Sequence, residues 1–212
     1  MSATQKDKRL FVSTIILVII HVAGIIGIHS PYKDLFLSLS AANLLVSAAL
    51  LLWNHKSFDT SLLSFIILTF LGGYFIEVLG VKTNLIFGSY EYGNTLGLKM
   101  LEVPVIIGVN WMMLVYCAGM IANRLNVSKF IKSTAGAALL TALDLLIEPV
   151  AIRYDFWDWY EGLPPLQNYV AWFIVSFLLL LVFNTLKFNK ENKLATTLFI
   201  IQLIFFATLC AF

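Results

Sequence analysis

Long apolar runs separated by short polar segments dominate the pattern along this chain of 212 residues. A helix that crosses a bilayer needs about 20 mostly apolar residues. Seven runs approach or exceed that length, and we predict a transmembrane helix for each: 10–28, 35–53, 62–80, 103–123, 134–152, 169–186 and 194–212. The first run is longer than the core of a signal peptide and is expected to be retained. The pattern predicts an all-α fold, a polytopic integral membrane bundle of about seven transmembrane helices in a single domain, 1–212.

Composition agrees with a bilayer as the surrounding solvent. Hydrophobic residues make up 60% of the chain and charged residues 12%, and the mean hydropathy is +0.88. Soluble domains have about 45–50% apolar and about 25% charged residues. A net charge of +2 gives no basic footprint for nucleic acid. Cys117 and Cys210 both lie inside apolar runs, so a disulfide scaffold is not predicted.

The basic residues orient the predicted bundle. With the N-terminus inside, ten of the 14 Lys and Arg residues fall on the cytoplasmic side and four outside, as the positive-inside rule expects. Seven spans then place the C-terminus outside, and we expect the protein in the cytoplasmic membrane of a prokaryote. Nine of the 12 acidic residues fall in the outer half or the outer loops. The long outer loops 81–102 and 153–168 are expected to carry function on the rigid helices.

Three carboxylates, Glu77, Asp144 and Glu148, lie within or at the ends of predicted spans. An acid at the centre of a spanning helix costs about 2.5–3.5 kcal/mol on insertion scales and usually faces the bundle interior. Asp144 and Glu148 are four residues apart and share a helix face, and Pro149 beside them predicts a bend. Without an intramembrane Lys or Arg, burial favours the neutral acid, which predicts a buried proton donor. In the alternative, the acids only hydrogen-bond neighbouring helices together.

Other polar and aromatic residues are harder to interpret. We expect Tyr74 to share a helix face with Glu77. Pro104 is expected in the first turn of its helix, with Asn110 and Trp111 about two turns below it. His55 is predicted to be a solvated loop residue. Taken alone, the aromatic side chains of the outer loops are typical of an interfacial belt: Tyr90, Tyr92, Tyr154, Phe156, Trp157, Trp159 and Tyr160. Because metal-ligand spacings and nucleotide-binding motifs are absent from the sequence, we expect no metal and no cofactor.

Short motifs follow one another in two blocks, Gly80-Val81-x-Thr83, Ile86-Phe87-Gly88-x-Tyr90-x-Tyr92, Leu96-Gly97, Val103-Pro104 and Asn110-Trp111, then Asp144, Glu148-Pro149-x-Ala151, Trp157-x-Trp159, Asn168 and Trp172. In order and spacing they resemble the carotenoid 1,2-hydratase family, which includes the bisanhydrobacterioruberin hydratases and γ-carotene 1′-hydroxylases. The resemblance covers nearly half of the chain. The chain departs from it at Asn84, where Gly is expected for a tight turn, although Asn also tolerates positive φ.

The resemblance implies addition of water across the terminal C1=C2 bond of an acyclic carotenoid end group, which gives a tertiary alcohol at C1. Protonation of C2 leaves a tertiary cation at C1 that aromatic faces stabilise. We expect Asp144 as the proton donor and Glu77 or Glu148 as the base that activates water. The expected substrate-binding residues are Tyr74, Tyr90, Asn110, Trp111, Trp157, Asn168 and Trp172. The implied partners are an acyclic or monocyclic carotenoid of the lycopene, γ-carotene or bacterioruberin-precursor type, the lipid bilayer and other carotenoid-pathway enzymes.

Two other functions fit the same residues. A carotenoid end-group cyclase begins with the same protonation but ends with ring closure and loss of a proton. A non-enzymatic membrane subunit, which binds lipid or assists assembly, would use its acids only to hold helices together.

Overall fold

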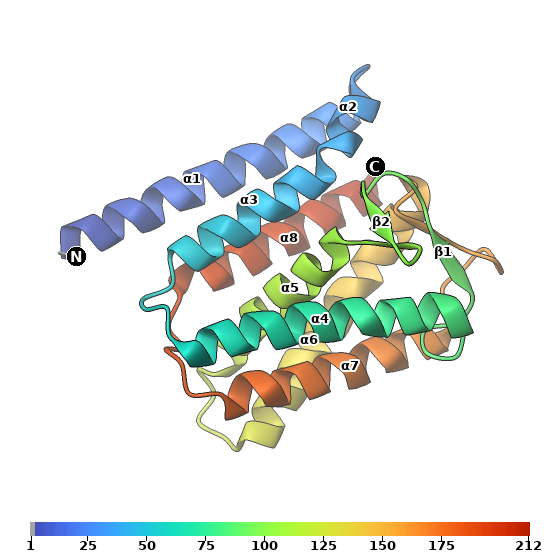
Figure 1. The fold of residues 1–212 in the computed structure, drawn as a ribbon. Coiled ribbons are helices and arrows are strands. Elements are labelled where there is room, and N and C mark those ends of the chain that lie inside the picture. Colours follow the sequence, from blue (N-terminus) through green and yellow to red (C-terminus); the bar gives the residue numbers. More distant parts are fainter. Residues whose placement is uncertain (1–2) are drawn as a thin grey trace.

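The computed structural model describes residues 3–212, and this part of the chain forms eight helices and two small sheets (Figure 1). The helices are α1 (Ala3–Ile28), α2 (Lys33–Ser38), α3 (Ser40–Trp53), α4 (Thr60–Thr83), α5 (Ile106–Ala122), α6 (Lys129–Arg153), α7 (Leu166–Thr185) and α8 (Lys193–Ala211). Each predicted apolar run contains a helix, which confirms the all-helical architecture. In the described residues, five helices are long and apolar enough to cross a membrane: α1, α4, α6, α7 and α8.

Two of the predicted spans differ from the observed helices. The second run is divided at Leu39 into α2 and α3. In the fourth run the helix begins only at Ile106, and Pro104 lies in strand β3 (Val103–Pro104), so the placement of Pro104 in a first helical turn is wrong. At 1.5 Å per residue, α3 is about 21 Å and α5 about 26 Å long, less than the roughly 30 Å of a hydrocarbon core.

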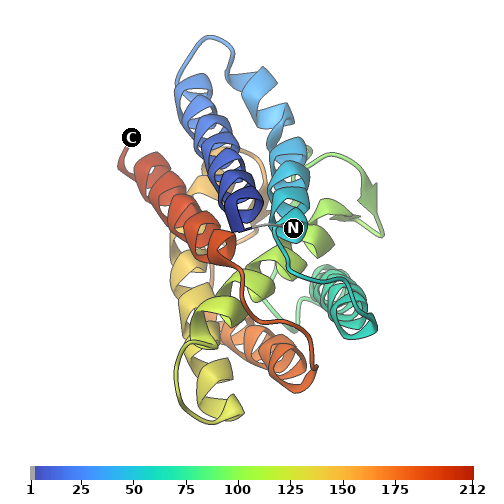
Figure 2. The ribbon, with the colours of Figure 1, turned by 90° about the vertical axis from the view of Figure 1, so that its left-hand side faces the viewer.

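The central helix of the bundle is α5, which crosses the middle of the molecule (Figure 2). It packs against α3, α4, α6, α7 and α8, and most of its side chains are buried. By contrast, α1 contacts mainly α8, α2 and α3, and only 28% of its most apolar window is buried. Val103 and Pro104, just before α5, are buried, and non-helical backbone is tolerated in a membrane protein where other protein encloses it.

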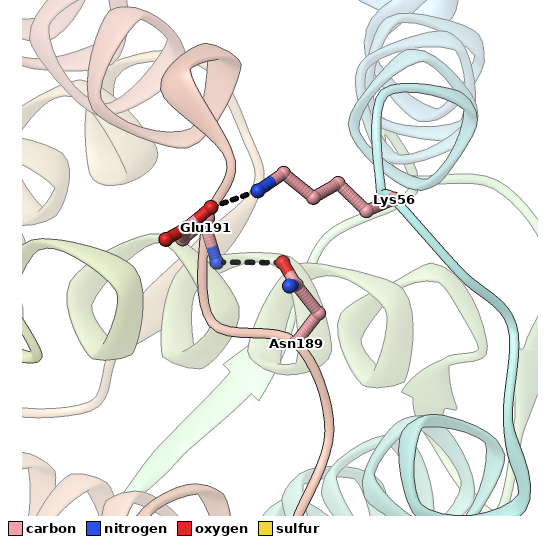
Figure 3. A network of polar contacts seen from close by, with 3 residues as sticks. All are labelled: Lys56, Asn189 and Glu191. Atoms are coloured by element: carbon pink, nitrogen blue, oxygen red, sulfur yellow. Dashed lines mark hydrogen bonds and ion pairs between the residues drawn. The ribbon is translucent and has the colours of Figure 1, made fainter. Parts of the chain in front are cut away.

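The N-terminus lies at one end of the bundle, and the C-terminus lies with both sheets at the other (Figure 1). At the N-terminal end, Asp59, Ser128 and Asn192 cap α4, α6 and α8 by accepting hydrogen bonds from backbone N–H groups of the first turns. An ion pair between Lys56 and Glu191 connects the loop before α4 to the loop before α8 (Figure 3).

His55, in the loop before α4, is buried, and its Nδ1 lies 2.6 Å from the hydroxyl of Tyr116. The prediction of a solvated His55 is therefore wrong. Burial is the main cause that lowers the pKa of this imidazole below its usual value of 6.5, and the charge of Asp59 opposes the shift.

The two long loops, 81–102 and 153–168, contain short strands that the sequence did not predict. Strand β1 (Tyr90–Tyr92) pairs antiparallel with β4 (Trp157–Trp159), and β2 (Lys99–Met100) pairs with β3. Asn84 ends α4 in the left-handed region with φ of 58°. This confirms that the position requires positive φ, which Asn supplies in place of Gly.

Candidate active site

The β1–β4 ribbon places four polar aromatic groups over the end of the bundle. Tyr90 pairs with Trp159 and Tyr92 with Trp157. Because side chains alternate between the two faces of a strand, these four share one face. They point inward, whereas the residues between them, Glu91 and Asp158, are exposed.

The inward face of the ribbon makes hydrogen bonds to two buried carboxylates. The interpretation of Tyr90, Tyr92, Trp157 and Trp159 as interfacial belt residues is therefore wrong. Of the other aromatic side chains assigned to that belt, Tyr154 is also buried, whereas Phe156 is half-buried and Tyr160 is exposed.

Glu77, on α4, accepts three hydrogen bonds. Its Oε2 accepts from the hydroxyls of Tyr90 at 2.5 Å and Tyr92 at 2.9 Å, and its Oε1 accepts from Nε1 of Trp111 at 2.9 Å. Burial, followed by the nearby Glu77 charge, raises the pKa of both tyrosines well above the usual value of 10.0. Both phenols therefore keep their protons and act as donors at neutral pH.

Glu148 and Asp144 form a second group on α6. The Oε2 of Glu148 accepts from Nε1 of Trp159 at 2.8 Å and of Trp157 at 3.1 Å. The side-chain amide of Asn168, on α7, donates to Glu148 Oε1 and to Asp144 Oδ2, both at 3.0 Å. This bridge agrees with the shared helix face predicted for the two acids. Asp144 is fully buried, and its Oδ1 has no hydrogen-bond partner among residues 3–212.

Close packing of α4 against its neighbours brings these groups together. Gly73 lies one turn before Glu77, and a Cβ at this glycine would fall 2.3 Å from the Cβ of Trp111. A Cβ at Gly80 would fall 2.6 Å from the ring of Phe87. Both glycines therefore allow an aromatic side chain to approach the helix that carries Glu77.

A small cavity of about 20 Å³ lies between the two carboxylate groups. One water needs roughly 10–15 Å³ of such volume, together with polar partners, so the cavity fits a single water. Its lining is acidic, amide and aromatic: Glu77, Phe87, Tyr90, Tyr92, Glu148, Trp157, Trp159, Asn168 and Trp172.

The structure brings most of the predicted site residues together. Trp111 stacks on Trp172 with ring centroids 4.4 Å apart, so both lie beside Glu77. Tyr74 lies elsewhere, because its hydroxyl donates to the backbone carbonyls of Met100 and Val103 and so holds the β2–β3 hairpin. Asn110 lines a separate cleft.

Sequence reasoning did not select Phe87, Tyr92 and Trp159 for the site. The alternating patterns Tyr-x-Tyr and Trp-x-Trp were the available signal, because alternation puts both aromatic residues of a strand on one face. Within residues 3–212, no three His, Cys, Asp or Glu side chains are arranged to hold a metal ion.

Comparison with known proteins gives one family and one curated relative. The sequence profile of the family described as "Carotenoid biosynthesis protein" matches residues 38–212. The bisanhydrobacterioruberin hydratase of Haloarcula japonica is 30% identical over 121 residues, which are 52% of this chain and 41% of the relative. The match thus spans about two fifths of the relative's length. No solved structure gives a significant match.

Proposed function

Because the chain belongs to the family of carotenoid biosynthesis proteins, we propose that it is a hydratase that adds water to the terminal C1=C2 bond of an acyclic carotenoid end group. The observation that carries this proposal is the water-sized cavity lined by Glu77 and Glu148, with Asp144 bridged to Glu148 by Asn168. The name of the similar Haloarcula protein supports hydration over other carotenoid chemistry. The reaction uses no cofactor, because acids and water supply every atom that it moves.

The Asp144–Glu148 pair is the proton source. Two buried carboxyl groups joined through one amide favour sharing a proton over carrying two negative charges. Asp144 is the donor, because its Oδ1 is the one oxygen of the three site carboxyl groups that has no hydrogen-bond partner within the described part of the chain. Each of the other oxygens accepts at least one bond from a hydroxyl or N–H group.

Glu77 is the base on the opposite side of the cavity. All of its hydrogen bonds come from neutral donors, which stabilise an ionised carboxylate. The acid gives a proton to C2, the oxygen of the cavity water bonds to C1, and Glu77 takes the proton that the water loses. Return of that proton from Glu77 to the acid pair restores the site. The net change is one water added to one double bond.

The aromatic walls stabilise the cation between these steps. Trp157, Trp159 and Trp172 line the cavity, and an aromatic face within about 6 Å of a desolvated cation contributes about 2 kcal/mol. Positive charge at C1 therefore develops among ring faces and carboxylates.

In the membrane, we propose seven crossings with the N-terminal end in the cytoplasm of a prokaryote. The pair α2 and α3 makes one interrupted crossing, and α5 makes a short crossing enclosed by other helices. The carboxylate site then faces the outer side. Labelling of cysteines introduced at Lys56 and Lys99, in intact and in permeabilised cells, tests this: intact cells should label only the variant at Lys99.

The activity is tested in cells that accumulate lycopene, by separating pigments and measuring their masses. A product heavier by one water supports the proposal, whereas an isomer of unchanged mass would identify a cyclase. Unaltered lycopene, with γ-carotene and a bacterioruberin-type precursor also unchanged, would contradict the proposal. Glu77→Gln, Asp144→Asn and Glu148→Gln are assayed in parallel, and full activity in all three would refute the mechanism.

A further inference from the structure

A second cavity, of about 90 Å³, lies beside the carboxylate site between α1, α3, α5, α6 and α8. Most of its lining is apolar and includes Leu44, Leu114, Ile147 and Phe206. Trp157 also lines this cleft and is the one described residue that lines both it and the water-sized cavity. The indole of Trp157 therefore forms a common wall between an apolar cleft and the carboxylates.

We propose that this end-group cleft binds the terminal isoprene units of the acyclic carotenoid and delivers the terminal double bond to the carboxylates past Trp157. The proposal rests on the proposed function and adds the place and direction from which the substrate reaches the site. An isoprenoid hydrocarbon fits because branched apolar side chains from several helices line the cleft. Pockets that enclose a drug-sized ligand measure roughly 300–1,000 Å³, so a cleft of about 90 Å³ takes only one end of the chain.

A buried polar group in the same cleft indicates a ligand, and this argument does not depend on the shape of the cleft. Gln202, on α8, lines the cleft and is 4% exposed, and its Oε1 has no hydrogen-bond partner in the described residues. A buried acceptor without a partner destabilises the folded protein. Gln202 is thus an acceptor for a donor that residues 3–212 do not supply, and the tertiary hydroxyl of the hydrated end group is such a donor. The cleft is therefore suited to the product as well as to the substrate.

Trp157 acts in this arrangement as a positioning residue. Its Nε1 donates to Glu148 at 3.1 Å, so movement of the indole by an arriving end group also changes the hydrogen bonding of the acid pair. Through this one side chain, occupancy of the cleft is coupled to proton donation by the acid pair.

Neighbouring residues on α3 provide a matched test. Leu44 lines the cleft and is half-buried, whereas Leu45 is 53% exposed on the outside of the same helix. Leu44→Trp fills the cleft, and Leu45→Trp adds the same bulk outside it. Each variant is produced in lycopene-accumulating cells, and the hydrated product and the lycopene retained per purified chain are measured. Leu44→Trp should lose most of both, and Leu45→Trp should keep both.

The outcomes separate this inference from the proposed function. If folded Leu44→Trp retains lycopene and forms product as the wild type does, the proposed binding role of the cleft is wrong, and the proposed hydratase activity still stands. Selective loss of retained lycopene in Leu44→Trp, in a protein whose wild type hydrates neither lycopene, γ-carotene nor a bacterioruberin-type precursor, would support the cleft and reject the hydratase. If Leu44→Trp does not fold, as judged by thermal unfolding, Asn43→Phe replaces it with Ala42→Phe as control, because Asn43 lines the cleft and Ala42 is exposed.

Discussion

Replacement of Glu77 by glutamine tests the site most directly, because this side chain collects three of its hydrogen bonds. An amide has one acceptor oxygen where a carboxylate has two. The best orientation turns that oxygen to the hydroxyls of Tyr90 and Tyr92 and leaves the amide nitrogen facing Nε1 of Trp111. The indole N–H of Trp111 and the two N–H groups of the new amide then lack the acceptor that Oε1 provided, so we expect the free energy of unfolding to fall by at least about 1–3 kcal/mol.

The loss of activity in Glu77→Gln should exceed what this destabilisation explains. Removal of a general base lowers a rate by about 10²–10⁴-fold. The assay compares hydrated product per folded chain, with the folded fraction measured by thermal unfolding in detergent. Trp111→Phe removes the same hydrogen bond but keeps the carboxylate, so it should lose similar stability and much less activity.

A control lies on the same strand as the Glu77 partners. Glu91 is on the exposed face of β1, and Glu91→Gln should match the wild type in both measurements. Equal losses of product in Glu77→Gln and Trp111→Phe, in proportion to their stability, would refute the role of Glu77 as a base and leave it a structural acceptor.

Three further changes have defined outcomes. Asn168→Leu removes both N–H groups that bridge the acid pair, and should lower the unfolding free energy by about 2 kcal/mol or more in denaturation experiments; an unchanged value would contradict the bridge. Gly73→Ala places a Cβ 2.3 Å from Trp111 and should cost about 1–3 kcal/mol with reduced product, whereas Gly72→Ala, whose Cβ meets only a flexible leucine methyl at 3.2 Å, should remain stable. Because the pKa of His55 is lower in the folded than in the unfolded chain, the stability that the neutral imidazole contributes should be fully present above about pH 6.5 and should be lost as the pH falls through the folded-state pKa. In His55→Gln, the melting temperature measured between pH 7.5 and 5 should depend less on pH. An unaltered pH dependence would exclude His55 as its source.

The helices were predictable because each rests on a long apolar run, and the shared face of Asp144 and Glu148 follows from helical spacing alone. The strands were not predictable for two reasons. Three residues are too few to establish a period of two, and the partner of β1 lies more than 60 residues away, in the loop 153–168. The break at Leu39 lies between Ser38 and Ser40 in an otherwise apolar run and has no Gly or Pro to signal it.

The largest errors concerned aromatic residues and a histidine. Aromatic residues near a membrane surface usually mark the interface, yet here their N–H and O–H groups bind Glu77 and Glu148. This arrangement depends on carboxylates from other elements, which sequence position does not reveal. For the same reason, the sequence predicted a solvated His55, whereas in the structure Tyr116 and other aromatic rings enclose its side chain.

The pairing of β1 with β4 makes the loops 81–102 and 153–168 sensitive to whether an insertion has an odd or an even number of residues. Surface loops usually accept changes of length freely. Here a shift of one residue within either strand would turn every side chain to the opposite face and present Glu91 or Asp158 to the buried acids in place of their donors. Functional relatives should therefore vary in length outside residues 90–92 and 157–159, and loop grafts between them should keep these two triplets intact.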